Sequence, residues 1–388
     1  NAGWANHQVV NIAFRGSDLE AVKHSIRGRK RCELSCSRLL PSDPFGVVGS
    51  HCGWPRPSRA DGGWTGLSRW WCRSLERGVV GMEFRWVPLA IRGPPPGLIG
   101  LDVAHEGQSC RIGHSMRRRV APQVIGAQRP ADYPQLMDEA RRDRARGALI
   151  GLACGDAVGT TVEFRSPGSF EPLVDMVGGG PFALPVGAWT DDTSMALCLA
   201  ESLIDRHGMD LADQMRRYLM WRSHGYLSST GTCFDIGGTV SSQLTRFRQT
   251  GEAVDPRSNE DSAANGSLMR LAPVPIFWHG DVAEAAERSG ESSRNTHAAQ
   301  RPVDACRLMG AMVAALIQGR SYEEVTATGF WVWGELHPQI AAIAAGSFRS
   351  KEPPEIRGSG FCVDALEAAL WAVDRSADFS EAVLAAAN

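Results

Sequence analysis

Lysine and long hydrophobic runs are scarce in this sequence of 388 residues. Only three of its 41 basic residues are lysine, at Lys23, Lys30 and Lys351, which is typical of a GC-rich coding sequence. The longest strongly apolar stretch covers residues 312–318, whereas a membrane-spanning helix needs about 20 apolar residues. The sequence also lacks a Gly-Lys-Ser/Thr phosphate loop and a strand-led Gly-x-Gly-x-x-Gly motif. These absences exclude a helical membrane protein and argue against a P-loop ATPase or a Rossmann domain.

The net charge of −2 is the sum of two unlike parts. Residues 1–135 hold 19 Lys+Arg and 10 Asp+Glu, whereas residues 136–388 hold 22 and 33. The first part also contains five of the ten cysteines and six of the twelve tryptophans, with no sustained helical or strand period. A basic segment with stacking aromatics is typical of a nucleic-acid-binding arm, but no nucleic-acid motif accompanies it. We therefore leave 1–135 unassigned, as a segment that is either disordered or not a genuine domain, and do not expect a nucleic-acid partner.

The second part carries apolar stripes at helical spacing. Stripes such as Met195, Leu199 and Leu203 repeat at i, i+4 and i+8. Seven helical segments are predicted in this way, near 137–153, 195–203, 211–219, 240–247, 303–317, 340–345 and 363–373. No stretch alternates as a strand does, so residues 136–388 are predicted to form a compact all-α, multi-helix domain.

The most distinctive polar cluster is Thr190-Asp191-Asp192-Thr193, at the start of a predicted helix. One interpretation is capping, because Asp and Thr side chains satisfy free N–H groups at helix N-termini. The other is a metal site, since carboxylate and hydroxyl oxygens suit Mg²⁺ or Mn²⁺. The four residues alone leave both open. Asp156 and Asp235, beside glycine-bearing loops, are interpreted mainly as helix caps that also border a cleft.

Six short motifs carry a resemblance to a known family. In chain order they are residues 147–159 (GALIGLACGDAVG), 162–164 (VEF), 189–193 (WTDDT), 233–237 (CFDIG), 265–273 (NGSLMRLAP) and 296–298 (THA). From about residue 136 onward the chain resembles the ADP-ribosylglycohydrolase family, of the dinitrogenase reductase-activating glycohydrolase type. The resemblance does not extend to residues 1–135.

This resemblance implies an all-α fold around a cleft with two Mg²⁺ or Mn²⁺ ions, which hydrolyses the bond between ADP-ribose and a protein side chain or a related small molecule. It implies the metal ligands Thr190, Asp191 and Asp192, and the catalytic residues Glu163, Asp191 and Asp192. The implied substrate-binding residues are Asn265, Gly266, Ser267, Met269 and His297. No signal peptide is recognised, so a cytoplasmic location is expected.

One expected motif is not found. The family's second metal half-site, an Asp-x-Asp-Thr stretch, would follow residues 382–388, and the sequence does not contain it. We therefore expect an incomplete domain that holds at most one half-site and has little or no hydrolase activity. The alternative is a non-catalytic ADP-ribose-binding or structural member of the same fold. The scissile linkage, the identity of the metal and the oligomeric state are not predicted.

Overall fold

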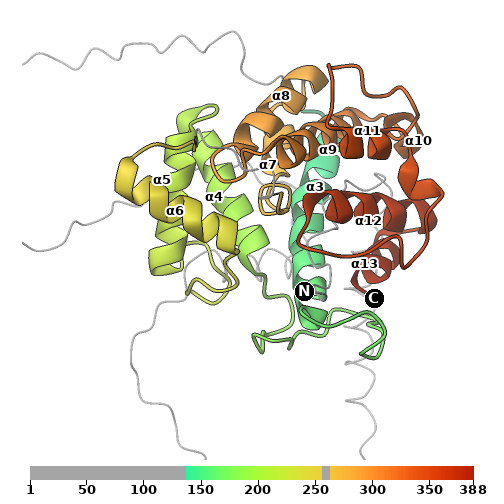
Figure 1. Ribbon diagram of the computed structural model, residues 1–388, viewed down its shortest axis with the longest axis horizontal. Coiled ribbons are helices and arrows are strands. Elements are labelled where there is room, and N and C mark those ends of the chain that lie inside the picture. The colour runs from blue at the N-terminus through green and yellow to red at the C-terminus, as the bar shows by residue number, and fades with distance from the viewer. Residues whose placement is uncertain (1–136, 256–262) are drawn as a thin grey trace, which may run out of the picture. The chain divides into compact units, whose positions relative to one another are not determined.

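The computed structural model describes residues 137–255 and 263–388, and the predictions for residues 1–135 lie outside this part of the chain. The described residues form helices and connecting loops (Figure 1). The helices are α3 (Glu139–Gly159), α4 (Asp191–Arg206), α5 (Leu211–His224), α6 (Gly238–Thr250), α7 (Pro273–Phe277), α8 (Val282–Ser293), α9 (Gln300–Gln318), α10 (Tyr322–Val325), α11 (Pro338–Ala344), α12 (Cys362–Arg375) and α13 (Phe379–Ala387), with 3₁₀ turns η1 (Thr160–Val162) and η2 (Ser347–Arg349).

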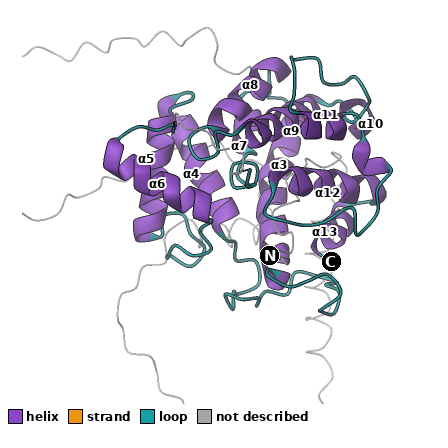
Figure 2. Cartoon of the chain, viewed as in Figure 1, coloured by secondary structure: helices purple, strands orange, loops and turns teal. Residues whose placement is uncertain are grey.

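The all-α prediction is confirmed. Each of the seven predicted segments falls on a helix, namely α3, α4, α5, α6, α9, α11 and α12. Within the described ranges the only strand-like pairings are two isolated bridges, Gly179 with Leu184 and Ala264 with Phe361. Figure 2 accordingly shows helices joined by loops. None of these helices is long and apolar enough to cross a bilayer.

The core is built around α9. Nearly every residue of this helix from Pro302 to Ile317 is buried, and α9 contacts α3, α7, α8, α11 and α12. A second cluster joins α4, α5 and α6 through side chains such as Met195, Trp221 and Leu244. The long helix α3 contacts α4, α9 and α13 and lies between the two groups of helices (Figure 1). Its C-terminal end and the N-terminus of α4 are thereby brought together.

The pairing of α8 with α9 depends on small residues. Ala285, Ser289 and Gly290 of α8 are buried. A Cβ atom on Gly310 of α9 would lie 2.0 Å from the Ser289 hydroxyl oxygen, so only glycine permits this approach. Helix α8 was not predicted from the sequence, because a stripe of Ala, Ser and Gly lacks the large apolar residues that mark a buried helix face.

Candidate active site

The three predicted metal ligands lie at the first turn of α4. Thr190 precedes the helix, Asp191 and Asp192 are its first two residues, and all three are buried, with at most 2% of their surface exposed. The loop before them contains Gly187 at φ +83°, a backbone conformation that favours glycine. The chain thus turns sharply into α4 and carries two carboxylates into the interior.

The cap of α4 comes from a different helix. The side chain of Thr190, the residue before α4, makes no capping bond to the first N–H groups of the helix. Instead, the Asp156 carboxylate of α3 accepts from the backbone N–H of Thr190 at 2.9 Å and of Thr193 at 3.1 Å. It also accepts from the hydroxyls of Thr190 at 2.8 Å and Thr193 at 2.7 Å. The interpretation of Asp156 as a cap is confirmed.

The sequence-based interpretation makes Asp235 mainly a helix cap, but the N-cap residue of α6 is Gly237, two residues after Asp235. The Asp235 carboxyl is hydrogen-bonded to Glu163, and burial raises the pKa of Asp235 to about 7. Burial, together with the nearby charge of Asp235, raises the pKa of Glu163 to about 9. The two carboxyls therefore act as a pair that holds a proton near neutral pH.

The carboxyl groups of Asp191 and Asp192 lie close enough to this pair to feel its charge. Burial, followed by the charges of neighbouring carboxylates, raises the pKa of Asp191 and of Asp192 well above the usual range. One oxygen of Asp192, Oδ1, is buried and has no hydrogen-bond partner in the part of the chain that the structure describes. Hard oxygen donors, an excess of negative charge and an unsatisfied buried carboxylate oxygen all fit a bound divalent cation. In the described part of the chain no three His, Cys, Asp or Glu side chains are grouped closely enough to hold a metal ion by themselves.

A cavity of about 620 Å³ brings most of the predicted residues together. Six of the nine predicted site residues line it: Glu163, Asp191, Asn265, Gly266, Met269 and His297. Its remaining lining includes Asp235, the start of α6 at Gly237 and Gly238, and the segment at Ser359 and Gly360. Ligand-binding cavities commonly have volumes of about 300–1,000 Å³, so this one is large enough for a nucleotide-sized molecule.

The other three predicted residues are not part of this lining. The hydroxyls of Thr190 and Ser267 make buried contacts: Thr190 bonds to Asp156, and Ser267 accepts from Ser293 at 2.8 Å. The buried Asp192 lies one residue behind Asp191 on α4. Ser267 nevertheless lies between Gly266 and Met269, which both line the cavity, so its loop borders the cavity.

A buried chain of hydrogen bonds supports His297. Arg270 Nη2 donates to the Thr296 hydroxyl at 2.7 Å, and that hydroxyl lies 2.8 Å from His297 Nδ1. Since Thr296 accepts from Arg270, its own proton is available to Nδ1, which assigns the imidazole proton to Nε2. Nε2 has no hydrogen-bond partner among residues 137–255 and 263–388. Burial, together with the charge of Arg270, lowers the pKa of His297 to about 3, so the ring presents a neutral N–H donor to the cavity.

Gly266 gives this imidazole its space. A Cβ atom at Gly266 would lie 2.8 Å from His297 Cε1 and 3.2 Å from Nε2. Arg270 fixes the same loop by donating from Nη1 to the Gly266 carbonyl at 3.1 Å. The buried guanidinium of Arg270 thus holds Gly266 directly and His297 through Thr296.

Sequence reasoning missed the aromatic side chains of the site. Phe164 and Phe182 line the cavity, and the ring of Phe234 packs on that of Phe182. Phe164 and Phe234 lie within the family motifs, next to Glu163 and Asp235, but nothing in their spacing indicated that the rings meet. Phe182 follows a run of three glycines, and no helical or strand period marks it.

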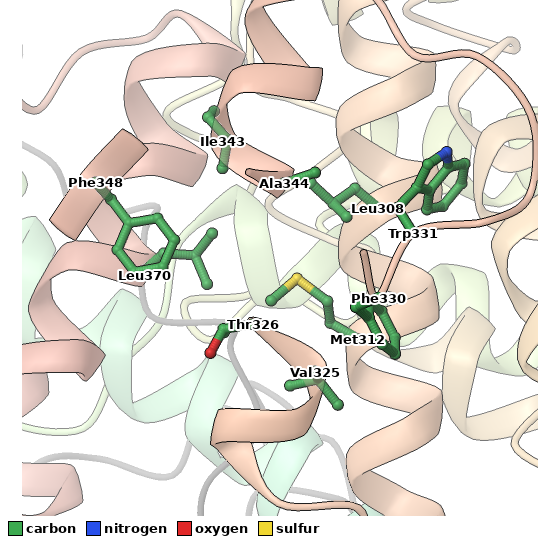
Figure 3. A pocket seen from close by; sticks show the side chains of 10 residues that line it. All are labelled: Leu308, Met312, Val325, Thr326, Phe330, Trp331, Ile343, Ala344, Phe348 and Leu370. Atoms are coloured by element: carbon green, nitrogen blue, oxygen red, sulfur yellow. The ribbon is translucent and has the colours of Figure 1, made fainter. Parts of the chain in front are cut away.

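A second cavity lies in the core beside α9, α11 and α12 and is lined by apolar side chains such as Met312, Phe348 and Leu370 (Figure 3). Its volume is about 10 Å³, at or below what one water molecule needs. It is a packing defect and not a ligand site.

The helical fold and its cavity agree with the all-α domain that the sequence motifs indicated. Residues 137–388 match the ADP-ribosylglycohydrolase family, and the chain belongs to this family of glycosidic-bond hydrolases. The predicted family and enzyme class are therefore confirmed.

Relatives with named activities are similar to this region of the chain. The chain is 43% identical over 253 residues to the ADP-ribosylarginine hydrolase Tri1 of Pseudomonas putida, covering 65% of this chain and 67% of the relative. It is 41% identical to Tri1 of Serratia proteamaculans, covering 63% and 66%. The ADP-ribosyl-[dinitrogen reductase] glycohydrolase of Rhodospirillum rubrum is 36% identical, covering 46% and 59%. The chain thus spans about two thirds of the length of both Tri1 proteins, and less of the third.

A solved structure supports the same fold. It is described as an ADP-ribosylglycohydrolase-related protein complex and superposes with a TM-score of 0.55 at 38% identity. The match covers 64% of this chain and 81% of the other.

Proposed function

We propose that this protein is a metal-dependent hydrolase that removes ADP-ribose from an arginine side chain of a modified protein. The observation that carries the proposal is the single cavity that joins the carboxyl groups of Glu163, Asp191 and Asp235 to the loop of Asn265 and Gly266. The linkage to arginine is inferred from the two Tri1 relatives, whose names specify ADP-ribosylarginine.

The lining suits the diphosphate and ribose of such a ligand. Gly237 and Gly238 begin α6, and free backbone N–H groups at a helix start bind anionic oxygens. The Nε2–H group of His297 supplies a further donor from the other loop. Glycine at these positions lets the backbone approach the ligand closely.

The carboxyl groups suit the chemistry of the scissile bond. Hydrolysis adds water to the anomeric carbon and breaks its bond to the guanidine nitrogen, while positive charge develops on the ribose. Carboxylates close to the ribose stabilise that charge. Glu163, which holds a proton through its pairing with Asp235, is the candidate donor of the proton that the departing nitrogen takes up.

Thr190, Asp191 and Asp192 would hold Mg²⁺ or Mn²⁺. When bound, the ion would orient ribose hydroxyls and activate water. The resemblance implies two ions, and these 388 residues contain one half-site. We therefore propose that the polypeptide has impaired activity by itself. A cytoplasmic location belongs to the same proposal and agrees with the five free cysteines of the described residues.

The test measures binding and turnover separately. The purified 388-residue protein is titrated calorimetrically with ADP-ribose, with and without Mn²⁺, and is incubated with a protein carrying ADP-ribosylated arginine. We expect Mn²⁺-enhanced binding and slow Mn²⁺-dependent release of ADP-ribose, which Glu163→Gln abolishes. Binding with no release under any condition would identify the non-catalytic ADP-ribose binder instead. Absence of both would refute the proposal.

A further inference from the structure

Three phenylalanine rings form a cluster beside the acidic part of the cavity. The rings of Phe164 and Phe182 lie edge to face with centroids 6.3 Å apart, and those of Phe182 and Phe234 are tilted with centroids 5.2 Å apart. Phe164 is 45% exposed although it lines the cavity, and the other two rings are half-buried. The cluster therefore borders the cavity and remains open to solvent, as an entrance would.

Local backbone geometry places each outer ring next to a carboxyl group. Phe164 has φ +61°, which is rare for a bulky residue, and Asp235 has φ +58°. At the first position the chain sends Glu163 inward, with 3% of its surface exposed, and Phe164 outward. At the second it lets Asp235 reach Glu163 while Phe234 stays in the cluster. Strained backbone conformations of this kind cluster at active sites and ligand-binding segments.

A glycine turn brings in the middle ring. Gly178, Gly179 and Gly180 all have positive φ, between +66° and +85°. A Cβ atom at Gly180 would lie 2.4 Å from the Thr160 carbonyl oxygen, so only glycine lets this turn pack on η1. Two backbone bonds between Gly179 and Leu184, of 2.7 and 2.9 Å, close the turn around Phe182. The position of Phe182 is thus fixed by the same short segment that precedes Glu163.

We propose that Phe164, Phe182 and Phe234 form the subsite for the acceptor guanidinium, the group released when the arginine–ribose bond breaks. This inference rests on the proposed function. A guanidinium is a planar cation that stacks on aromatic faces and pairs with carboxylates, and the cluster offers rings directly beside Glu163 and Asp235. An amino acid acceptor without a planar cation would gain little from these rings, so the cluster selects arginine over other linkages.

The adenine base is a less suitable occupant. In ADP-ribose the adenine and the scissile bond lie at opposite ends of the molecule, separated by the diphosphate. The rings adjoin the carboxyl groups assigned to the scissile bond, so a ligand with its reacting carbon there places the leaving group, and not the adenine, against Phe164.

The experiment compares two ligands that differ only in the acceptor. ADP-ribosyl-arginine and ADP-ribose are titrated calorimetrically, with Mn²⁺, into the full chain carrying Glu163→Gln, which keeps the side-chain volume but cannot transfer a proton. Phe164→Leu is added to remove the ring, and Phe164→Tyr to restore it. Phe170→Leu is the matched control. Phe170 lies in the same loop and does not line the cavity, and its ring centroid lies 5.5 Å from Arg165 Cζ.

We expect Phe164→Leu to weaken ADP-ribosyl-arginine by about fivefold, within the range of cation–π contacts, and to leave ADP-ribose within about twofold. Phe164→Tyr should restore the arginine ligand, and Phe170→Leu should change neither. Equal weakening of both ligands by Phe164→Leu would place the rings on ADP-ribose itself and overturn the inference, as would no effect on either. If the protein without the phenylalanine changes binds neither ligand, the proposed function fails as well.

Discussion

Asp156 and Thr190, 34 residues apart in the sequence, are joined by three hydrogen bonds. The Asp156 carboxylate accepts two from the backbone N–H of Thr190 and one from its hydroxyl. Asp156 lies in the last turn of α3, and Thr190 is the residue before α4. The orientation of Asp191 and Asp192 therefore depends on α3 as much as on their own helix.

Replacing Asp156 should destabilise the protein far more than removal of an ordinary cap. Asp156→Ala leaves two N–H groups and two hydroxyls of Thr190 and Thr193 buried without their acceptor, and unsatisfied buried groups cost about 1–3 kcal/mol each. We expect the free energy of unfolding, measured in urea, to fall by at least about 3 kcal/mol. Asp281→Ala, which removes the exposed cap of α8, should cost about 1 kcal/mol. Similar losses in the two variants would contradict a special role for Asp156.

The Thr296 hydroxyl should determine the tautomer of His297. Thr296→Val keeps the shape of the side chain but removes the link between Arg270 and Nδ1. We expect ¹⁵N NMR of the imidazole to change from a single Nε2–H form to a mixture, and ADP-ribose affinity to fall about tenfold, or 1.4 kcal/mol. Thr296→Ser, which retains the hydroxyl, should keep both properties. An unchanged ¹⁵N pattern in the valine variant would refute the assignment.

His297 should also make stability depend on pH in acid. Its pKa is about 3 when folded, because of burial and the charge of Arg270, against 6.5 as the ordinary value. Between these values the unfolded chain binds the extra proton, so its contribution to stability is complete above pH 6.5 and is lost as pH falls toward 3. The slope approaches about 1.4 kcal/mol per pH unit. The difference in unfolding free energy between wild type and His297→Gln should shrink from pH 6.5 to pH 4 and be constant above pH 7.5. A difference that does not vary with pH would exclude His297 as the source.

Divalent cations should stabilise the fold through Asp191. Mn²⁺ at ten times its dissociation constant would add about 1.4 kcal/mol by mass action. We expect Mn²⁺ to raise the thermal midpoint of the wild type but not of Asp191→Asn. In EDTA that variant should be at least as stable as wild type, because one of several neighbouring buried carboxylates is neutralised. Asp205→Asn, at an exposed position of the same helix, is the control and should keep the Mn²⁺ increment. An equal Mn²⁺ effect in all three proteins would disprove the site.

Much of the fold could be predicted from apolar periodicity. Leu199 and Leu203 on α4, or Leu244 on α6, mark buried faces with large side chains, and these helices were predicted. Helix α8 was not predicted. Its buried face consists of small residues such as Ala285 and Ser289, which can pack closely only because the partner helix α9 has a glycine at position 310. The burial of α8 therefore depends on the residues of both helices together and cannot be recognised in the sequence of α8 alone.

The candidate site also has parts that the sequence predicts and parts that it does not. Six predicted residues line one cavity, and the motifs that contain them lie at or between the ends of helices. The acceptor of the α4 cap could not be identified locally, since Asp156 lies on another helix. The positive φ of Phe164 and the packing of Gly180 on η1 likewise could not be predicted, because no period in the sequence records them.

The buried guanidinium of Arg270 has a consequence for how a ligand enters. Its hydrogen bonds in the described structure go to neutral oxygens, on Gly266, Asn295 and Thr296, and its charge faces the ring of Tyr218 at 4.8 Å. One part of the cavity is thus backed by an uncompensated cation, while another part carries the carboxyls of Glu163, Asp191 and Asp235. A long-range field of this kind sorts the two ends of a molecule before contact. An ADP-ribosyl group, anionic at its diphosphate and electron-poor at its reacting carbon, would be drawn in with one polarity and repelled with the other.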